Sequence, residues 1–238
     1  MRRMATFGIA LWALALATSA TGASLTTQGR TGLPVVREGE NTTQIRGARV
    51  VLRVEGRNLR VEQFLRLALP AGAKEGVRLS VAVRESDYRA EGEGGMDVRS
   101  ARGFTRFGVA VDGNPVKARV EPWSVNRAGD TATRWRTWPV AMRPGRETVV
   151  QVTSTAPLSR RGGRHAVEFT AKDLGRWLGR PRYLEIRLEA PGDIETRVAG
   201  VEPQPTDVTS KGLRWVRRGS RLQRDVMVLL PSDYRPGR

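Results

Sequence analysis

Apolar and polar residues alternate with a period of two along several stretches of the chain. Val50, Leu52 and Val54 alternate with Arg49 and Arg53. Such alternation places one face of a β-strand in a core and the other in water, and we expect regular structure to begin near Ile45. Comparable apolar patterns predict further strands over 77–83, 149–152, 167–169, 184–188 and 226–229.

The segment over 59–69 fits two periods. Leu59, Val61 and Leu65 share one parity, which indicates a strand that stops at the Pro70-Ala71-Gly72 turn. Apolar residues also recur at helical spacing through Phe64 and Ala68, so a helix is a competing interpretation. We predict a strand here.

A hairpin is indicated over 107–120. Phe107, Val109 and Val111 precede the sequence Asp112-Gly113-Asn114-Pro115, and alternating apolar residues follow it. Asp-Gly supplies the positive φ values that a tight hairpin turn requires. The segment therefore predicts two antiparallel strands joined at Asp112 and Gly113.

One short helix is predicted near 171–178. Thr170 can cap its first turn, Asp173 stands at the third position after the cap, and Gly179 can end it. Short strands separated by Gly, Pro and Asp favour an all-β, mainly antiparallel fold, a β-sandwich with one lobe or two packed lobes. The polar stretch over 126–133 is the expected internal break.

The N-terminal residues are typical of an export signal. Arg2 and Arg3 precede the apolar run FGIALWALAL over 7–16, which is too short to span a bilayer, and small residues follow over 17–23. The arginine pair also opens a twin-arginine signal, but the next residues do not complete one. We expect cleavage after Ala20 or Ala23 and a periplasmic or secreted chain with no later transmembrane segment.

These signals divide the chain into four parts. We predict a signal peptide over 1–23, a flexible lead-in over 24–43, a β-sandwich region over 44–232 and a tail over 233–238.

Composition adds a strong positive charge. The chain has 41 basic and 24 acidic side chains, a formal net charge of +17, and losing Arg2 and Arg3 with the signal leaves +15. This charge is either a surface that binds anions or a product of arginine-rich genome composition. The chain has no cysteine, which excludes disulfides and thiolate metal sites.

Several pieces in order resemble a group of secreted or periplasmic bacterial β-sandwich proteins of unknown function. They are the export signal, FGVAVDGNPV over 107–116, the strand over 149–152, RWLG over 176–179 leading into YLEIRLEAP from Tyr183, GLRW over 212–215 and DVMVLLP from Asp225. The resemblance implies a fold and a compartment, and it implies no functional residue.

No catalytic motif stands out. His165 is the only histidine, the G-x-S-x-G and H-E-x-x-H motifs are absent, and Glu91, Glu93 and Asp97 form the one tight acidic cluster on a glycine-rich loop. Those acids could serve a hydrolase acting on polysaccharide or bind calcium, or they could belong to an exposed turn. We expect no enzymatic activity, no cofactor and no metal.

Two basic clusters and one tryptophan cluster are the candidate binding residues. Guanidinium groups bind oxyanions in pairs of hydrogen bonds, and exposed indole rings stack on sugars, although both kinds of residue also occur as solubilising charge and as core. The candidates for anion binding are Arg160, Arg161, Arg164, Arg217, Arg218 and Arg221, and those for carbohydrate stacking are Trp123, Trp135 and Trp138.

The expected function is a non-catalytic exported module that is structural or binding, with an anionic envelope polymer or an envelope protein as partner. The alternative is a polysaccharide-acting hydrolase or a carbohydrate-binding module. Nucleic acid is not expected as a partner.

Overall fold

The computed structural model describes most of the chain after residue 30. The described residues are 31–38, 42–88, 103–125, 131–161, 163–171, 177–178, 180–190, 200–210, 212–220, 222 and 224–234. The predicted signal peptide over 1–23 lies outside them.

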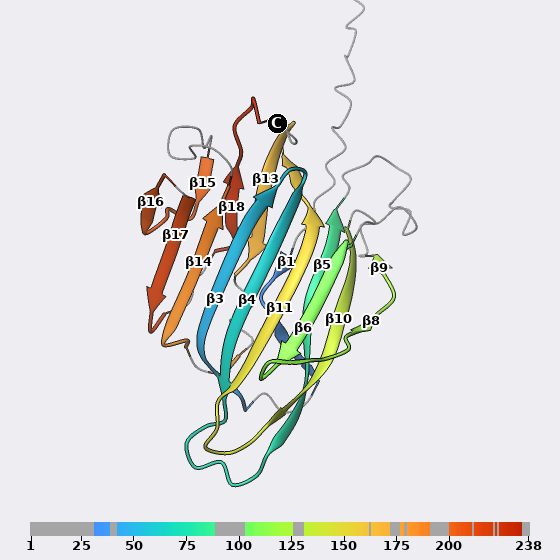
Figure 1. Ribbon diagram of the computed structural model, residues 1–238, viewed down its shortest axis with the longest axis vertical. Helices are drawn as coiled ribbons and strands as arrows, with labels where there is room; N and C mark the ends of the chain where they lie inside the picture. Colours follow the sequence, from blue (N-terminus) through green and yellow to red (C-terminus); the bar gives the residue numbers. More distant parts are fainter. Residues whose placement is uncertain are drawn as a thin grey trace, which may run out of the picture.

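An eight-stranded sheet forms one layer of the molecule (Figure 1). Neighbouring strands are antiparallel except for one central parallel pair, β14 and β3. In spatial order the strands are β16 (Asp207–Thr209), β17 (Gly212–Arg218), β14 (Tyr183–Glu189), β3 (Gln44–Glu55), β4 (Asn58–Ala68), β11 (Thr148–Pro157), β6 (Arg106–Val111) and β7 (Asn114–Pro115).

Two five-stranded sheets lie behind this layer in Figure 1. The first contains β2 (Val35–Glu38), β5 (Val77–Tyr88), β10 (Thr131–Met142) and β8 (Arg119–Val120), with β9 (Ser124–Val125) also paired to β10. The second contains β1 (Thr31–Gly32), β13 (Arg164–Thr170), β18 (Val226–Leu229) and β15 (Gly200–Glu202), with β12 (Ser159–Arg161) also paired to β13. The chain passes from β1 directly into β2 and so connects the two sheets.

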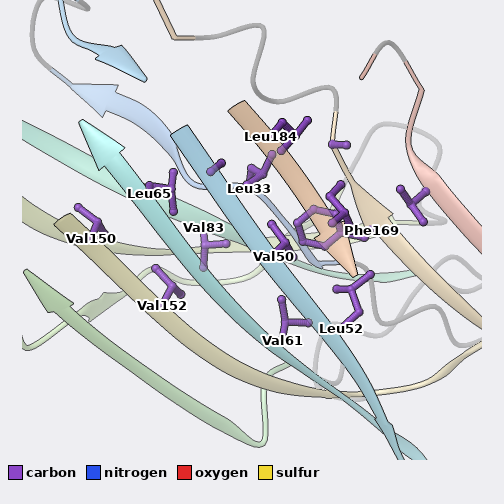
Figure 2. Close-up of a cluster of buried hydrophobic side chains, with 14 of the residues drawn as sticks. Leu33, Val50, Leu52, Val61, Leu65, Val83, Val150, Val152, Phe169 and Leu184 are labelled. Carbon is purple, nitrogen blue, oxygen red and sulfur yellow. The ribbon is translucent and has the colours of Figure 1, made fainter. Parts of the chain in front are cut away.

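The alternating apolar residues meet between the layers. Figure 2 shows Val50 and Leu65 of the large sheet with Val83 of β5 and Phe169 of β13, and these side chains belong to one buried cluster. Each fully buried side chain of this size contributes about 1.5–3 kcal/mol by leaving water. The cluster therefore holds all three sheets together.

The predicted all-β, mainly antiparallel class is confirmed. The segment over 59–69 is a strand, because β4 alternates buried and outward residues along almost its whole length. The hairpin is also confirmed, with Asp112 at φ 51° and Gly113 at φ 81° between β6 and β7. β7 is only two residues long, and the chain then crosses to β10 through β8.

The flexible lead-in is wrong for residues 31–38, which form β1 and β2. Leu33 and Val35 are buried, and the Leu33 amide donates to the Thr170 carbonyl at 3.2 Å. Strand structure thus begins well before Ile45, because two apolar side chains in a polar segment are enough to dock it against the core.

The predicted helix near 171–178 is not seen. Residues 172–176 lie outside the described residues, Ala171 is not helical, and Leu178 forms a parallel bridge with Gln44. Trp177 is buried and its Nε1 donates to the Pro34 carbonyl at 2.8 Å. The tryptophan docks this segment against the chain between β1 and β2.

The polar stretch over 126–133 runs into a long strand that the pattern did not predict. Residues 131–133 open β10, which pairs with β5 over twelve residues, while 126–130 lie outside the described residues. Arg134 and Arg136 share the parity of buried Trp138, and both donate to the buried carboxylate of Glu85. Ion pairing with Glu85 allows two arginines to occupy inward positions of this strand.

Candidate functional site

The outward face of the eight-stranded sheet is rich in arginine. Its side chains alternate with the core residues, and strand register places them in rows that cross the sheet. One row runs Arg218, Tyr183, Gly47, Arg66 and Val149, and the next runs Val216, Glu185, Arg49, Phe64 and Gln151.

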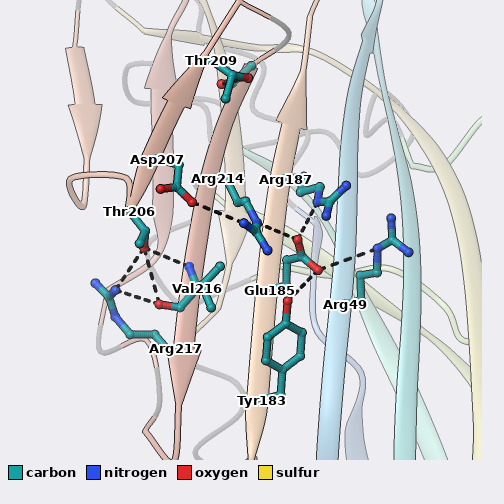
Figure 3. A network of polar contacts seen from close by, with 11 residues as sticks. Arg49, Tyr183, Glu185, Arg187, Thr206, Asp207, Thr209, Arg214, Val216 and Arg217 are labelled. Atoms are coloured by element: carbon teal, nitrogen blue, oxygen red, sulfur yellow. Dashed lines mark hydrogen bonds and ion pairs between the residues drawn. The ribbon is translucent and has the colours of Figure 1, made fainter.

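Glu185 is the centre of a polar network on this face (Figure 3). Its carboxylate accepts hydrogen bonds from the Tyr183 hydroxyl at 2.8 Å, from Arg187 Nε at 2.5 Å and from Arg214 Nε at 2.8 Å. Arg49 Nε lies 3.9 Å from the same group. One buried carboxylate therefore holds several neighbouring side chains in fixed positions.

The network keeps Glu185 ionised. Burial by itself raises the pKa of this carboxyl, but the hydrogen bonds from Arg187, Tyr183 and Arg214 outweigh burial, so the pKa lies below its ordinary value. The pKa of Arg214 is raised by its hydrogen bond to Glu185. Arg187 and Arg214 thus share Glu185 as an ion-pair partner, and Arg214 also pairs with Asp207 at 3.3 Å.

A hollow of about 650 Å³ opens beside this network, over the rows that contain Gly47. Gly47 has no side chain to fill the space between its register partners Tyr183 and Arg66. Arg46 is the extra residue of a β-bulge against β4, and bulges re-aim side chains out of the regular alternation. The residues that line the hollow are Arg46, Gly47, Ala48, Arg49, Phe64, Arg66, Glu147, Val149, Arg182 and Tyr183.

Arg49 belongs both to the hollow and to the network around Glu185, but the other arginines of the hollow differ in their pairing. Arg46, Arg66 and Arg182 make no side-chain hydrogen bond or ion pair with any residue that the structure describes. Glu147 is the one acid among the lining residues, and Phe64 is 37% exposed. The hollow thus combines unpaired guanidinium groups with an accessible aromatic ring.

This arrangement suits a ligand that carries both an anionic group and a ring. Guanidinium groups bind carboxylate or phosphate by charge-assisted hydrogen bonds, and an exposed phenyl ring packs against the apolar face of a sugar or other ring. Tyr183 also lines the hollow, and its hydroxyl donates to the Glu185 carboxylate at 2.8 Å.

The predicted basic clusters lie on different sheets. Arg160 and Arg164 are exposed on the β12–β13 hairpin, and Arg161 Nε pairs with Glu168 at 2.5 Å. Arg218 is the register partner of Tyr183 and so stands next to the hollow. Arg217 donates to the Thr206 hydroxyl at 3.4 Å, and Arg221 lies outside the described residues.

The three tryptophans do not form one stacking platform. Trp138 is wrong as a sugar-stacking residue, because it is 1% exposed and packs near Phe107 in the core. Arg134 covers Trp123 at 4.6 Å from the ring centroid, and Arg37 covers Trp135 at the same distance. Trp135 and Trp138 are three positions apart on β10, and side chains an odd number of positions apart point to opposite faces of a sheet.

The remaining candidates for chemistry do not enter the site. The acidic loop with Glu91, Glu93 and Asp97 lies outside the described residues. His165 packs edge-on against Tyr234, and burial together with Arg160 and Arg57 lowers its pKa. Within the described part of the chain, no group of three His, Cys, Asp or Glu side chains could hold a metal ion, and no helix is long and apolar enough to cross a membrane.

Sequence reasoning missed Arg46, Arg66, Arg182 and Phe64. Arg66 and Phe64 do stand at the polar parity of a recognised strand, which was the available signal. Their meeting with Arg182 depends on the parallel pairing of β14 with β3, across more than a hundred residues of sequence. No local pattern encodes that pairing.

No family model matches this chain, and no curated protein does. Solved structures do match. A "putative nutrient binding protein" from Legionella pneumophila is 12% identical with a TM-score of 0.66, covering 87% of this chain and 72% of that one. At this identity the likeness shows the fold alone.

Two enzyme structures match less well. An M1 zinc metallopeptidase from Deinococcus radiodurans is 11% identical with a TM-score of 0.42, over 81% of this chain and 43% of that one. Yeast LTA4 hydrolase is 9% identical with a TM-score of 0.45, over 82% of this chain and 30% of that one.

Proposed function

We propose that this protein is a non-catalytic binding module that holds an anionic, ring-containing ligand in the hollow over Gly47. The observation that carries the proposal is that Arg46, Arg66 and Arg182, which have no side-chain partner among the described residues, line one hollow together with the exposed Phe64. An anion in the hollow would be attracted by these positive charges.

The nearby network supports this assignment by contrast. Around Glu185 the arginines pair with a protein carboxylate, whereas Arg46, Arg66 and Arg182 of the adjoining hollow have no such partner among the described residues. The net charge of +17 would draw anions towards the molecule, and this attraction weakens with salt. The Legionella neighbour is described as a nutrient binding protein, which agrees with a binding role here.

The place of action is part of the proposal. The cationic start, the short apolar run and the small residues over 1–23 support export, so the ligand would be met in the periplasm or outside the cell. An anionic polymer or surface of the envelope is a partner with the required charge.

Calorimetric titration with a short oligogalacturonate tests the proposal, because each unit of this probe carries a ring and a carboxylate. Arg66→Gln combined with Arg182→Gln should lower affinity about a hundredfold, since each lost charge-assisted contact costs roughly 1.5 kcal/mol. The matched control is Arg160→Gln combined with Arg164→Gln, which removes the same charge from exposed arginines elsewhere. Neutral maltohexaose should bind neither protein.

The control decides the outcome. Equal loss of affinity in both double variants would mean that the charge acts as a general field rather than as a site, and the proposal would be abandoned. Full loss in the first variant with little change in the second supports the hollow over Gly47.

A further inference from the structure

A second hollow of about 640 Å³ lies on the same outward face, towards the opposite end of the strands. Gly108 of β6 is among its lining residues, and the hydroxyl of its register partner Thr153 donates to the Gly108 carbonyl at 3.5 Å. Its lining residues are Glu55, Asn58, Arg60, Thr105, Arg106, Phe107, Gly108, Thr153, Ser154 and Thr155.

The chemistry of this second hollow differs from that of the first. Hydroxyl and amide groups dominate its lining, and Arg60 is already paired with Glu62 at 2.8 Å and lies 3.9 Å from Glu55. Arg106 makes no side-chain hydrogen bond or ion pair with a described residue. Such a lining offers hydrogen bonds to the hydroxyl groups of a sugar, because neutral donors and acceptors match them, and Arg106 offers a cation to a carboxylate of the same sugar.

The register fixes how far apart the two hollows are. Gly47 on β3 and Gly108 on β6 are three strand steps apart, or about 14 Å at roughly 4.8 Å per step. Their rows cross β11 at Val149 and Thr153, four residues apart, which adds about 14 Å along the strand. The diagonal is therefore about 20 Å, longer than a single sugar ring can span.

The strip between the hollows is able to support a chain. Phe64 and Gln151 are register partners on β4 and β11, and they lie in the row next to Gly47 on the way to Thr153. Phe64 is exposed, while Gln151 offers an amide. A polymer crossing here would meet a ring and then hydrogen-bonding groups.

We propose that the ligand is an acidic polysaccharide that runs diagonally across this face, with an anionic unit in the hollow over Gly47 and a further unit in the hollow over Gly108. This inference rests on the proposed function and adds the class of the ligand and its direction. A nucleic acid fits less well, because the hydroxyl and amide groups of the second hollow match sugar hydroxyls rather than phosphates.

The test is a length series of oligogalacturonates, from the monomer to the octamer, titrated against the wild-type protein and two variants. Binding at two linked positions should make the long oligomers about a hundredfold tighter than the dimer. Arg106→Gln with Thr155→Val should leave dimer affinity unchanged and remove that gain. Gly47→Leu, which fills the first hollow, should weaken every length.

Each outcome separates the two proposals. Dimer binding that does not strengthen with length, or a gain that survives Arg106→Gln with Thr155→Val, would overturn the diagonal path while leaving the first hollow standing. Absence of binding at every length would overturn the proposed function itself. Tighter binding of a single-stranded oligodeoxynucleotide of equal charge would overturn the assignment to polysaccharide. Thermal unfolding of each variant verifies that it is folded.

Discussion

Replacing Glu185 by glutamine should destabilise the protein measurably at neutral pH. Glutamine keeps the shape of the side chain but removes the charge that accepts from Tyr183, Arg187 and Arg214. Its amide nitrogen would also face guanidinium donors, which cannot accept a hydrogen bond. The variant therefore leaves neighbouring positive charges without their shared partner.

The magnitude follows from the contacts and their exposure. A hydrogen bond to a charged group contributes roughly 1.5–3 kcal/mol, and Glu185 accepts three. Arg187 and Arg214 are 40% and 39% exposed, so water replaces part of what they lose. We expect a net cost of about 2 kcal/mol, which lowers the ratio of folded to unfolded protein about thirtyfold.

The cost should depend on pH in a defined direction. The pKa of Glu185 lies below its ordinary value of 4.5 in the folded protein. Its contribution is therefore complete above 4.5 and is lost as the pH falls through the folded-state value. The difference between wild type and Glu185→Gln should begin to shrink below pH 4.5 and should vanish only below the folded-state pKa of Glu185.

Urea unfolding at several pH values measures this difference. Glu189→Gln is the matched control, because Glu189 is 42% exposed and its one side-chain partner among the described residues is Arg53. That substitution should cost less than about 1 kcal/mol. A Glu185→Gln cost equal to the control, or one that persists unchanged in acid, would refute the network as the source of stability.

Three further predictions concern the core, a strand glycine and the C-terminal segment. Trp215→Phe should lower the free energy of unfolding by about 1–2 kcal/mol more than Trp138→Phe does, as measured by urea unfolding. The reason is that Trp215 donates to a backbone carbonyl at 2.8 Å, whereas the buried Trp138 nitrogen has no partner among the described residues. Gly212→Ala should lower the free energy of unfolding by about 3 kcal/mol or more, because the φ of Gly212 is 146° and a Cβ there would overlap a neighbouring backbone carbonyl. Gly47→Ala should be as stable as wild type, because a Cβ at position 47 makes only ordinary van der Waals contact. Tyr234→Phe loses a 2.7 Å hydrogen bond to a backbone carbonyl, and cleavage of the C-terminal segment under limited proteolysis should become faster; an unchanged rate would argue against that anchor.

Strands with clean alternation could be predicted from sequence, and strands with charged inward residues could not. The alternation of Val50, Leu52 and Val54 predicts β3, because hydrophobic burial alone decides which face of this strand is inside. In β10 the inward Arg134 and Arg136 depend on Glu85 from a neighbouring strand. A hydrophobic pattern contains information about one strand only, so the polar residues at the start of β10 indicated an internal break instead of a strand.

The candidate site shows the same limit more strongly. The sequence predicts anion binding where arginines are close in sequence, as at Arg160 and Arg161. The arginines that line the hollow come instead from separate strands or from the residues next to them. A glycine at position 47 becomes a cavity floor only when β14 and β4 pair on either side of β3. The net positive charge could be predicted from composition, but the gathering of arginines at the hollow depends on how β14, β3 and β4 pair.

The most direct test of the central claim is to locate a bound anion on the protein by NMR. Titration of galacturonate oligomers into the labelled chain should shift the arginine Nε–Hε signals of Arg46, Arg66 and Arg182 first, together with the backbone signal of Gly47, and leave those of Arg160 and Arg164 unchanged. Shifts confined to the β12–β13 hairpin, or spread evenly over all exposed arginines, would contradict the assignment of the binding site to the hollow over Gly47.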